Sequence, residues 1–173
     1  QAALFQNEGE ALIDPARLGW GLADACTRLG VRIVERTALV DIERRGAGLA
    51  LRTDHGTIVC GSAVLGTGAF PSPVRAITRR VVPVYDYVLA TEPLDDDQLA
   101  SIGWRGRQGI SDAANQFHYY RMTQDRRILW GGYDAVFHNW GRIDESLEQR
   151  PDTHRKLAEH FFETFPQLEG LHF

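Results

Sequence analysis

The sequence predicts an α/β fold with α+β character, and three features of the chain favour it. A helix begins at Asp14-Pro15, and short runs of β-branched residues separated by glycine turns follow over residues 31–60. Further strand-like runs occupy residues 81–133, and a last helix covers 151–165. Strands and helices that follow one another in blocks are typical of sheets covered by helices.

The first helix has a clear start and a clear end. Asp14 is a residue type preferred at the N-cap, and Pro15 suits the first helical position because an N–H there has no partner. Leu18 and Leu22 then recur at helical spacing, and Gly30 stops the helix.

Four short runs after this helix predict an antiparallel meander. They are rich in β-branched and aliphatic residues, and glycine-containing turns separate the last three. The runs cover residues 31–35, 39–43, 49–53 and 57–60.

A strand that ends in glycines is the most informative feature of the chain. Residues 62–65 are too apolar for a half-exposed strand, so we expect a buried, parallel strand, which Gly66-Thr67-Gly68 follows. Glycine has no Cβ, so such an ending lets the backbone approach a bulky ligand, as in dinucleotide-binding proteins. The glycine-rich turn G-x-G-x-x-G has no complete copy here. We therefore interpret the chain as an internal part of a dinucleotide enzyme.

The second half of the chain predicts a separate sheet with helices. Residues 81–91, 117–123 and 127–133 are strand-like, and the last two runs form a hairpin. The acidic residues 95–97 favour the start of a short helix, because carboxylates stabilise a helix N-terminus. The helix at 151–165 carries its apolar residues on one face: Leu157, Phe161, Phe162 and Phe165.

Composition argues against several classes of function. Nineteen basic and 23 acidic residues give a net charge of −4 without a basic stripe, so we expect no nucleic-acid partner. No apolar run approaches the ~18 residues that a membrane-spanning helix needs, so we expect no membrane partner. Cys26, Cys60 and the six histidines lack metal-site spacing. We expect two reduced thiols, no metal and a cytoplasmic protein.

Five segments form a succession of motifs with a specific order and spacing. They are 13–18 (IDPARL), 35–40 (ERT followed by Val40), 65–69 (LGTGA), 82–94 (VPVYDYVLATEPL) and 119–132 (YYRMTQDRRILWGG). Together they resemble the FAD-dependent D-amino-acid oxidase (DAO) family. The similarity is greatest to its bacterial, amine-oxidising branch, which includes gamma-glutamylputrescine oxidoreductase and glycine-oxidase-like enzymes.

The resemblance implies an FAD-binding domain within 1–80 and a substrate-binding domain with a mixed sheet within 81–173. It also implies the reaction, in which a hydride passes from the carbon beside the substrate nitrogen to FAD, and water hydrolyses the resulting imine. For the cofactor, it implies that Val40 faces the adenine through its main chain. Thr67 and Gly68 match the segment that approaches the FAD.

Two residues of the hairpin are candidates for substrate binding. Tyr119 aligns with the family position that closes the substrate cavity, and alternation along a strand places Arg121 on the same face. A tyrosine hydroxyl can bind a substrate amine or carboxylate, and the forked guanidinium suits a carboxylate. The alternative is that Arg121 is a solvated arginine paired with Asp125 or Asp134.

We therefore predict part of an FAD-dependent oxidoreductase that acts on a small amine or amino acid. Two alternatives stay open: a non-catalytic ligand-binding or regulatory module of the same architecture, and a flavin-independent α+β protein with accidental motifs. Without the glycine-rich turn, we expect residues 1–173 alone to bind no FAD and to be inactive. We also expect the strand at 62–65 to expose apolar surface and a sheet edge, so that the chain either dimerises through this edge or rearranges to cover it.

Overall fold

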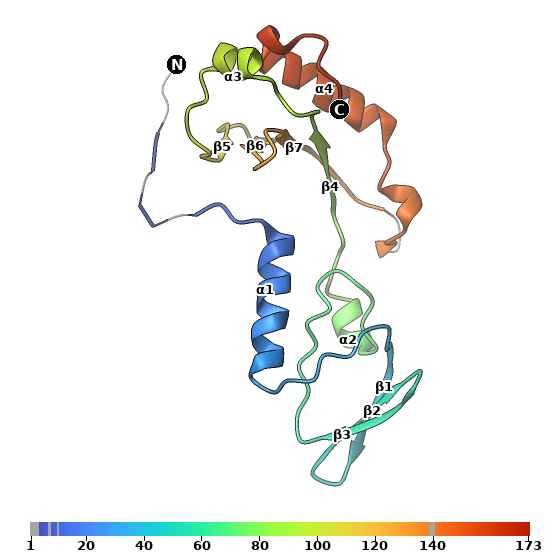
Figure 1. Cartoon of the computed structure of the whole chain (residues 1–173). Helices are drawn as coiled ribbons and strands as arrows, with labels where there is room; N and C mark the ends of the chain where they lie inside the picture. The colour runs from blue at the N-terminus through green and yellow to red at the C-terminus, as the bar shows by residue number, and fades with distance from the viewer. Residues whose placement is uncertain (1–3, 7, 10, 139–140) are drawn as a thin grey trace. The chain divides into compact units, whose positions relative to one another are not determined.

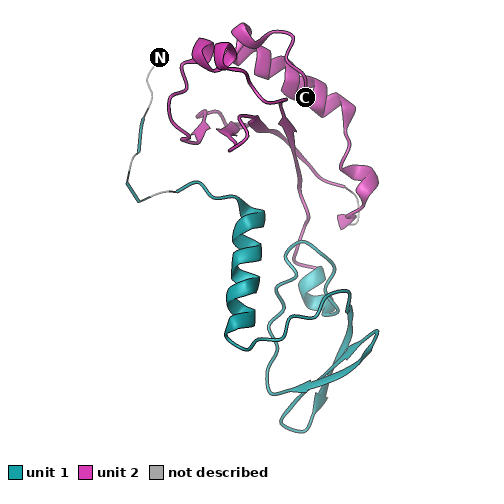
Figure 2. Ribbon diagram, in the orientation of Figure 1, with its two compact units in different colours: residues 1–78 teal, residues 79–173 magenta. Residues whose placement is uncertain are grey.

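The computed structural model of the chain describes residues 4–6, 8–9, 11–138 and 141–173 (Figure 1). The chain divides into two compact units, Gln1–Thr78 and Arg79–Phe173 (Figure 2). Each unit contains its own sheet and its own helices. The predicted α/β class with α+β character is confirmed.

Unit 1 begins with helix α1 (Pro15–Arg28), which starts where the sequence predicts. The Asp14 side chain caps the helix by accepting a hydrogen bond from the Arg17 N–H at 3.1 Å. Its apolar residues stay accessible, because Leu18 and Leu22 are 45% and 57% exposed.

The sheet of unit 1 is the predicted antiparallel meander. It consists of β1 (Leu39–Arg45), β2 (Gly48–Thr53) and β3 (Gly56–Cys60) in sequence order. A bulge interrupts the β1–β2 ladder between Leu39 and Asp41. A short helix, α2 (Arg75–Thr78), ends the unit.

Two of the predicted strands do not form. Residues 31–35 and 62–65 have no strand structure, and Val64 is 96% exposed. The prediction of a buried parallel strand at 62–65 is therefore wrong for the described residues. A strand requires a neighbour that pairs with its backbone N–H and C=O groups, and none of the strands in the described part of the chain pairs with these runs. Dimerisation through a sheet edge stays a prediction, although the strand at 62–65 that would have formed this edge is absent from the described residues.

Unit 2 is built on a four-stranded sheet of order β4-β7-β6-β5. Its strands are β4 (Tyr85–Ala90), β5 (Ile110–Ser111), β6 (His118–Met122) and β7 (Ile128–Val136). Every pair of neighbours is antiparallel, where the expectation was a mixed sheet. The predicted hairpin is confirmed as β6–β7, and the long strand predicted at 81–91 is shortened to β4.

The helices of unit 2 follow the predicted pattern. Helix α3 (Asp96–Ile102) has Asp95 as its N-cap, and α4 (Pro151–Thr164) is the predicted last helix. Two short 3-10 helices flank α4: Glu145–Leu147 and Pro166–Leu168. Among the described residues, no helix combines the length and the apolar character that crossing a membrane requires.

The core of unit 2 lies between α4 and one face of the sheet. Trp130 from β7 and Phe161 from α4 meet edge to face, with ring centroids 5.7 Å apart. Leu157 and Phe161 are 1% and 0% exposed, so α4 buries the face predicted from its spacing. The opposite face of the sheet carries exposed apolar side chains, among them Val88 at 43% and Phe117 at 48%.

Candidate functional site

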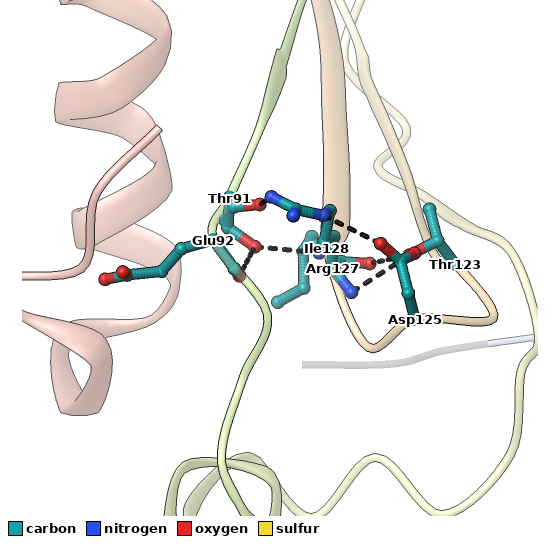
Figure 3. Close-up of polar contacts among 6 residues, drawn as sticks. All are labelled: Thr91, Glu92, Thr123, Asp125, Arg127 and Ile128. Atoms are coloured by element: carbon teal, nitrogen blue, oxygen red, sulfur yellow. Dashed lines mark hydrogen bonds and ion pairs between the residues drawn. The ribbon is translucent and has the colours of Figure 1, made fainter.

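The turn between β6 and β7 is fixed to the end of β4 by a network of polar contacts (Figure 3). The Arg127 guanidinium donates to the Asp125 carboxylate at 2.8 Å and to the Thr91 carbonyl at 3.0 Å. The Thr91 hydroxyl accepts from the Ile128 N–H at 2.9 Å. Hydrogen bonds from the Thr123 hydroxyl and from Arg127 lower the pKa of Asp125. The network holds the hairpin, and with it the predicted substrate residues, in one register.

Tyr119 crosses the sheet because the neighbouring strand has glycine at the right position. Tyr119 of β6 and Val88 of β4 are both paired with Gly131 of β7, so the three residues form one row. A Cβ added to Gly131 would stand 2.7 Å from Cζ of Tyr119 and 2.9 Å from a methyl group of Val88. Only a residue without a side chain leaves room for the phenol ring over β7.

A bulge in β7 shapes the same row. Between the pairs Val88–Gly131 and Asp86–Ala135, β4 advances by two residues and β7 by four. Within this stretch, Gly132 has a φ of 109°, and an added Cβ would stand 2.2 Å from the Phe117 carbonyl oxygen. The bulge therefore requires a glycine at position 132 on both conformational and steric grounds.

The Tyr119 hydroxyl reaches across β7 to β4 and donates a hydrogen bond to Oδ2 of Asp86 at 2.9 Å. Burial of the ring, and then the hydrogen bond and charge of Asp86, raise the pKa of Tyr119 to about 12. The phenol is therefore protonated throughout the neutral range. We call these two side chains the Asp86–Tyr119 pair.

Arg121 lies on the same sheet face as Tyr119, as alternation predicts. Its partner in the ladder is Leu129, which places it one row along from the Tyr119–Gly131 row. The two carboxylates considered as alternative partners have contacts of their own. Asp125 binds Thr123 and Arg127, and Asp134 accepts from the Thr153 hydroxyl at 3.0 Å.

The other face of β6 is tied to α4 by a chain of polar side chains. The His118 ring contacts the Asp112 carboxylate at 2.8 Å and the His160 ring at 2.9 Å, and it stacks on Trp130. Burial raises the pKa of Asp112, but hydrogen bonds from the Ala114 N–H and from His118 outweigh it and hold this pKa below its ordinary value. These contacts fix the strand whose opposite face carries Tyr119. Among the described residues, no cluster of histidine, cysteine and acidic side chains is suited to hold a metal ion.

The residues predicted to contact a cofactor all lie in unit 1. Val40 falls at the bulge of β1, and a bulge leaves its extra residue out of the ladder. Gly68 has a φ of 56° in the turn that the Phe70 N–H closes on the Thr67 carbonyl, and no atom stands within 4 Å of where its Cβ would be. A bulge residue outside the ladder at Val40 and the open space around Gly68 are compatible with the close approach of a flavin nucleotide. Val40, Thr67 and Gly68 thus belong to unit 1, whereas Tyr119 and Arg121 belong to unit 2.

The class of protein follows from comparison with known families. A family model described as FAD dependent oxidoreductase (DAO) matches residues 1–172. The chain belongs to this family.

Three individual relatives share between 26% and 31% sequence identity with the chain. Over 98% of the chain, the sequence is 31% identical to gamma-glutamylputrescine oxidoreductase of Escherichia coli. Over 92% of the chain, it is 28% identical to a probable oxidoreductase OrdL of Haemophilus influenzae. A probable oxidoreductase OrdL of Rhizobium meliloti is 26% identical over 76% of the chain. The chain spans 35%, 37% and 30% of the OrdL protein of H. influenzae, the E. coli enzyme and the R. meliloti protein, about a third of their length. No solved structure gives a significant match.

Sequence reasoning missed Asp86 as a member of the site. The signal was present, because Asp86 is a carboxylate within the apolar run 84–90 of a strand. What no pattern indicated was the contact itself, which joins residues 33 apart in the sequence.

Proposed function

We propose that the protein oxidises a C–N bond of a small amine or amino acid by hydride transfer to FAD. The family match over residues 1–172 carries this proposal. A relative that is 31% identical is named as an oxidoreductase of an amine, gamma-glutamylputrescine, which supports the substrate class.

In this proposal, one group of residues contacts the cofactor and another binds the substrate. Bound FAD supplies the acceptor for the hydride. The main chain at Val40, Thr67 and Gly68 lies along the cofactor, and the bulge at Val40 and the open space around Gly68 allow close approach. Tyr119 and Arg121 hold the substrate on the uncovered sheet face, so that the reacting carbon is presented in one orientation.

The test is anaerobic reduction of the flavin in the full-length protein purified with FAD. Gamma-glutamylputrescine, glycine, sarcosine and simple alkylamines are added in turn, and the loss of the oxidised flavin absorbance is followed. We expect bleaching by at least one of them. Replacing Arg121→Lys removes the forked donor and is expected to raise KM for a carboxylate-bearing substrate roughly tenfold. Arg155→Lys, an exposed change on α4 (side chain 66% exposed), is the matched control.

Bound flavin that no compound of the panel reduces would contradict the proposal and favour a non-catalytic binding module. We further propose that residues 1–173 expressed alone bind no FAD and are inactive, because the sequence has no complete G-x-G-x-x-G turn for the pyrophosphate. Stoichiometric yellow flavin in that preparation would show this part to be wrong. A cytoplasmic location belongs to the proposal as well, supported by the free thiols Cys26 and Cys60.

A further inference from the structure

We infer that the Asp86–Tyr119 pair is a binding site for the primary ammonium group of the substrate. This inference rests on the proposed function and specifies the substrate class, an alkylamine that binds as a cation through its nitrogen. One N–H proton of the bound ammonium group then passes to water, so that the neutral amine gives up the hydride and becomes the imine.

The first argument is the inventory of donors and acceptors in the pair. A phenol has a single O–H, and Tyr119 donates it to Oδ2 of Asp86. What the pair then offers to a ligand is the remaining lone pairs of the phenol oxygen and of the carboxylate. A site made only of acceptors selects a ligand with several donors, and a primary ammonium group has three.

The second argument is charge. Among the ion pairs between described residues, none includes Asp86. The pair therefore carries a net negative charge that a cationic ligand neutralises. A substrate carboxylate placed here would meet a like charge, and it would find the only hydroxyl hydrogen already donated.

The third argument is the surroundings of the pair. The rings of Phe117 and Tyr119 lie 6.3 Å apart on the uncovered face, and Val88 lies in the same row as Tyr119. Aromatic faces attract an ammonium group, and the apolar side chains suit the methylene groups attached to it. The glycine at position 131 has a role in this site, because it lets the phenol reach Asp86.

From the sequence, the Tyr119 hydroxyl could bind either the amine or the carboxylate of a substrate. The structural arguments above favour the amine. The amine goes to the Asp86–Tyr119 pair. A carboxylate, where the substrate has one, is left to Arg121 in the next row.

The test compares three four-carbon probes of different charge: butylammonium, butan-1-ol and butyrate. Their binding to the full-length, FAD-loaded protein is measured by isothermal titration calorimetry. We expect butylammonium to bind most tightly, and Asp86→Asn to weaken it on the order of tenfold to a hundredfold with little effect on butan-1-ol. Tyr119→Phe is expected to weaken it less, since the charge stays. Asp97→Asn, the same change at an exposed residue of α3, is the control.

An alkaline titration gives a readout that does not depend on turnover. Because burial and the contact with Asp86 raise the pKa of Tyr119 to about 12, we expect its phenol to ionise only near that pH. In Asp86→Asn we expect the pKa of Tyr119 to fall, because the charge of Asp86 is lost, but to stay above the ordinary value, because the ring is still partly buried. The sign for stability follows from linkage: a raised tyrosine pKa stabilises the fold fully below pH ~10, and this contribution disappears as the pH rises through ~12.

The outcomes separate the inference from the proposed function. Flavin reduction by amines together with unchanged butylammonium binding in Asp86→Asn would overturn the inference alone, as would tighter binding of butyrate than of butylammonium. Asp86-dependent butylammonium binding without any flavin reduction would leave the inference standing and refute the proposed function. If Asp86→Asn does not fold, Tyr119→Phe decides: butylammonium binding equal to that of the unchanged protein overturns the inference.

Discussion

The two units of this chain have similar elements but very different interiors. Each has an antiparallel sheet and a helix of 14 residues, α1 in unit 1 and α4 in unit 2. All eight buried hydrophobic residues among the described ones belong to unit 2. In unit 1, no described residue is buried.

This difference shows that a sequence can form regular helices and strands without also forming a hydrophobic core. The ladders of β1–β3 satisfy backbone groups locally, but α1 keeps an apolar surface that includes Trp20 at 72% exposure. Burial of apolar area is the main favourable term in folding. We therefore expect unit 2 by itself to have a larger free energy of unfolding than unit 1 by itself.

The strongest test of this comparison removes one apolar side chain from each helix. Phe161→Ala in α4 empties a site that is 0% exposed, and it is expected to cost about 4 kcal/mol of unfolding free energy. Leu22→Ala in α1 removes a side chain that is 57% exposed and is expected to change stability by less than about 0.5 kcal/mol. Urea denaturation measures both. Equal losses in the two variants would contradict the assignment of the core to unit 2.

Glycine substitutions sharpen the comparison, because they are expected to act with opposite signs in the two units. Gly132→Ala places a Cβ 2.2 Å from the Phe117 carbonyl oxygen at a φ of 109°, and we expect a loss on the order of 3 kcal/mol. Gly21→Ala in α1 meets no atom within 4 Å and gains helix propensity, so a gain of about 0.5–1 kcal/mol in helix stability is expected. Thermal melts followed by circular dichroism distinguish these signs, and a Gly132→Ala protein as stable as the parent would show that the bulge is not rigid.

The sequence was most informative where a structural signal is local. Asp14-Pro15 marked the start of α1, and the spacing of Leu157 and Phe161 marked the buried face of α4, because capping and helical period depend on neighbouring residues only. Alternation likewise placed Tyr119 and Arg121 on one face of β6.

The failures concern contacts between distant parts of the chain. The apolar run 62–65 has the composition of a strand, but a strand exists only with a partner, which composition does not supply. The Asp86–Tyr119 hydrogen bond depends on the register of three strands and on a glycine in the middle one. None of these conditions leaves a pattern in the residues around Asp86.

The smallest expected effect comes from the helix caps, which are chemically alike in the two units. Asp95 accepts a hydrogen bond from the Gln98 N–H at 2.7 Å, and the Gln98 side chain accepts from the Asp95 N–H at 2.9 Å. Asp14 makes only the first kind of contact, with the Arg17 N–H. Replacing either aspartate by alanine removes a cap worth about 1 kcal/mol to its helix.

The consequence differs because a cap affects global stability only when its helix is packed on a core. Helix α3 is in contact with the 3-10 helix Pro166–Leu168, whose Leu168 is 2% exposed, so Asp95→Ala is expected to lower the unfolding free energy of unit 2 by about 1 kcal/mol. Helix α1 has no such packing on the other described helices and strands of unit 1, so Asp14→Ala is expected to open only the first turn of α1. Amide hydrogen exchange distinguishes the two cases: faster exchange throughout unit 2 in Asp95→Ala, and confined to the start of α1 in Asp14→Ala. Faster exchange across the β1–β3 sheet in Asp14→Ala would show that unit 1 is cooperative despite the absence of buried residues among those described.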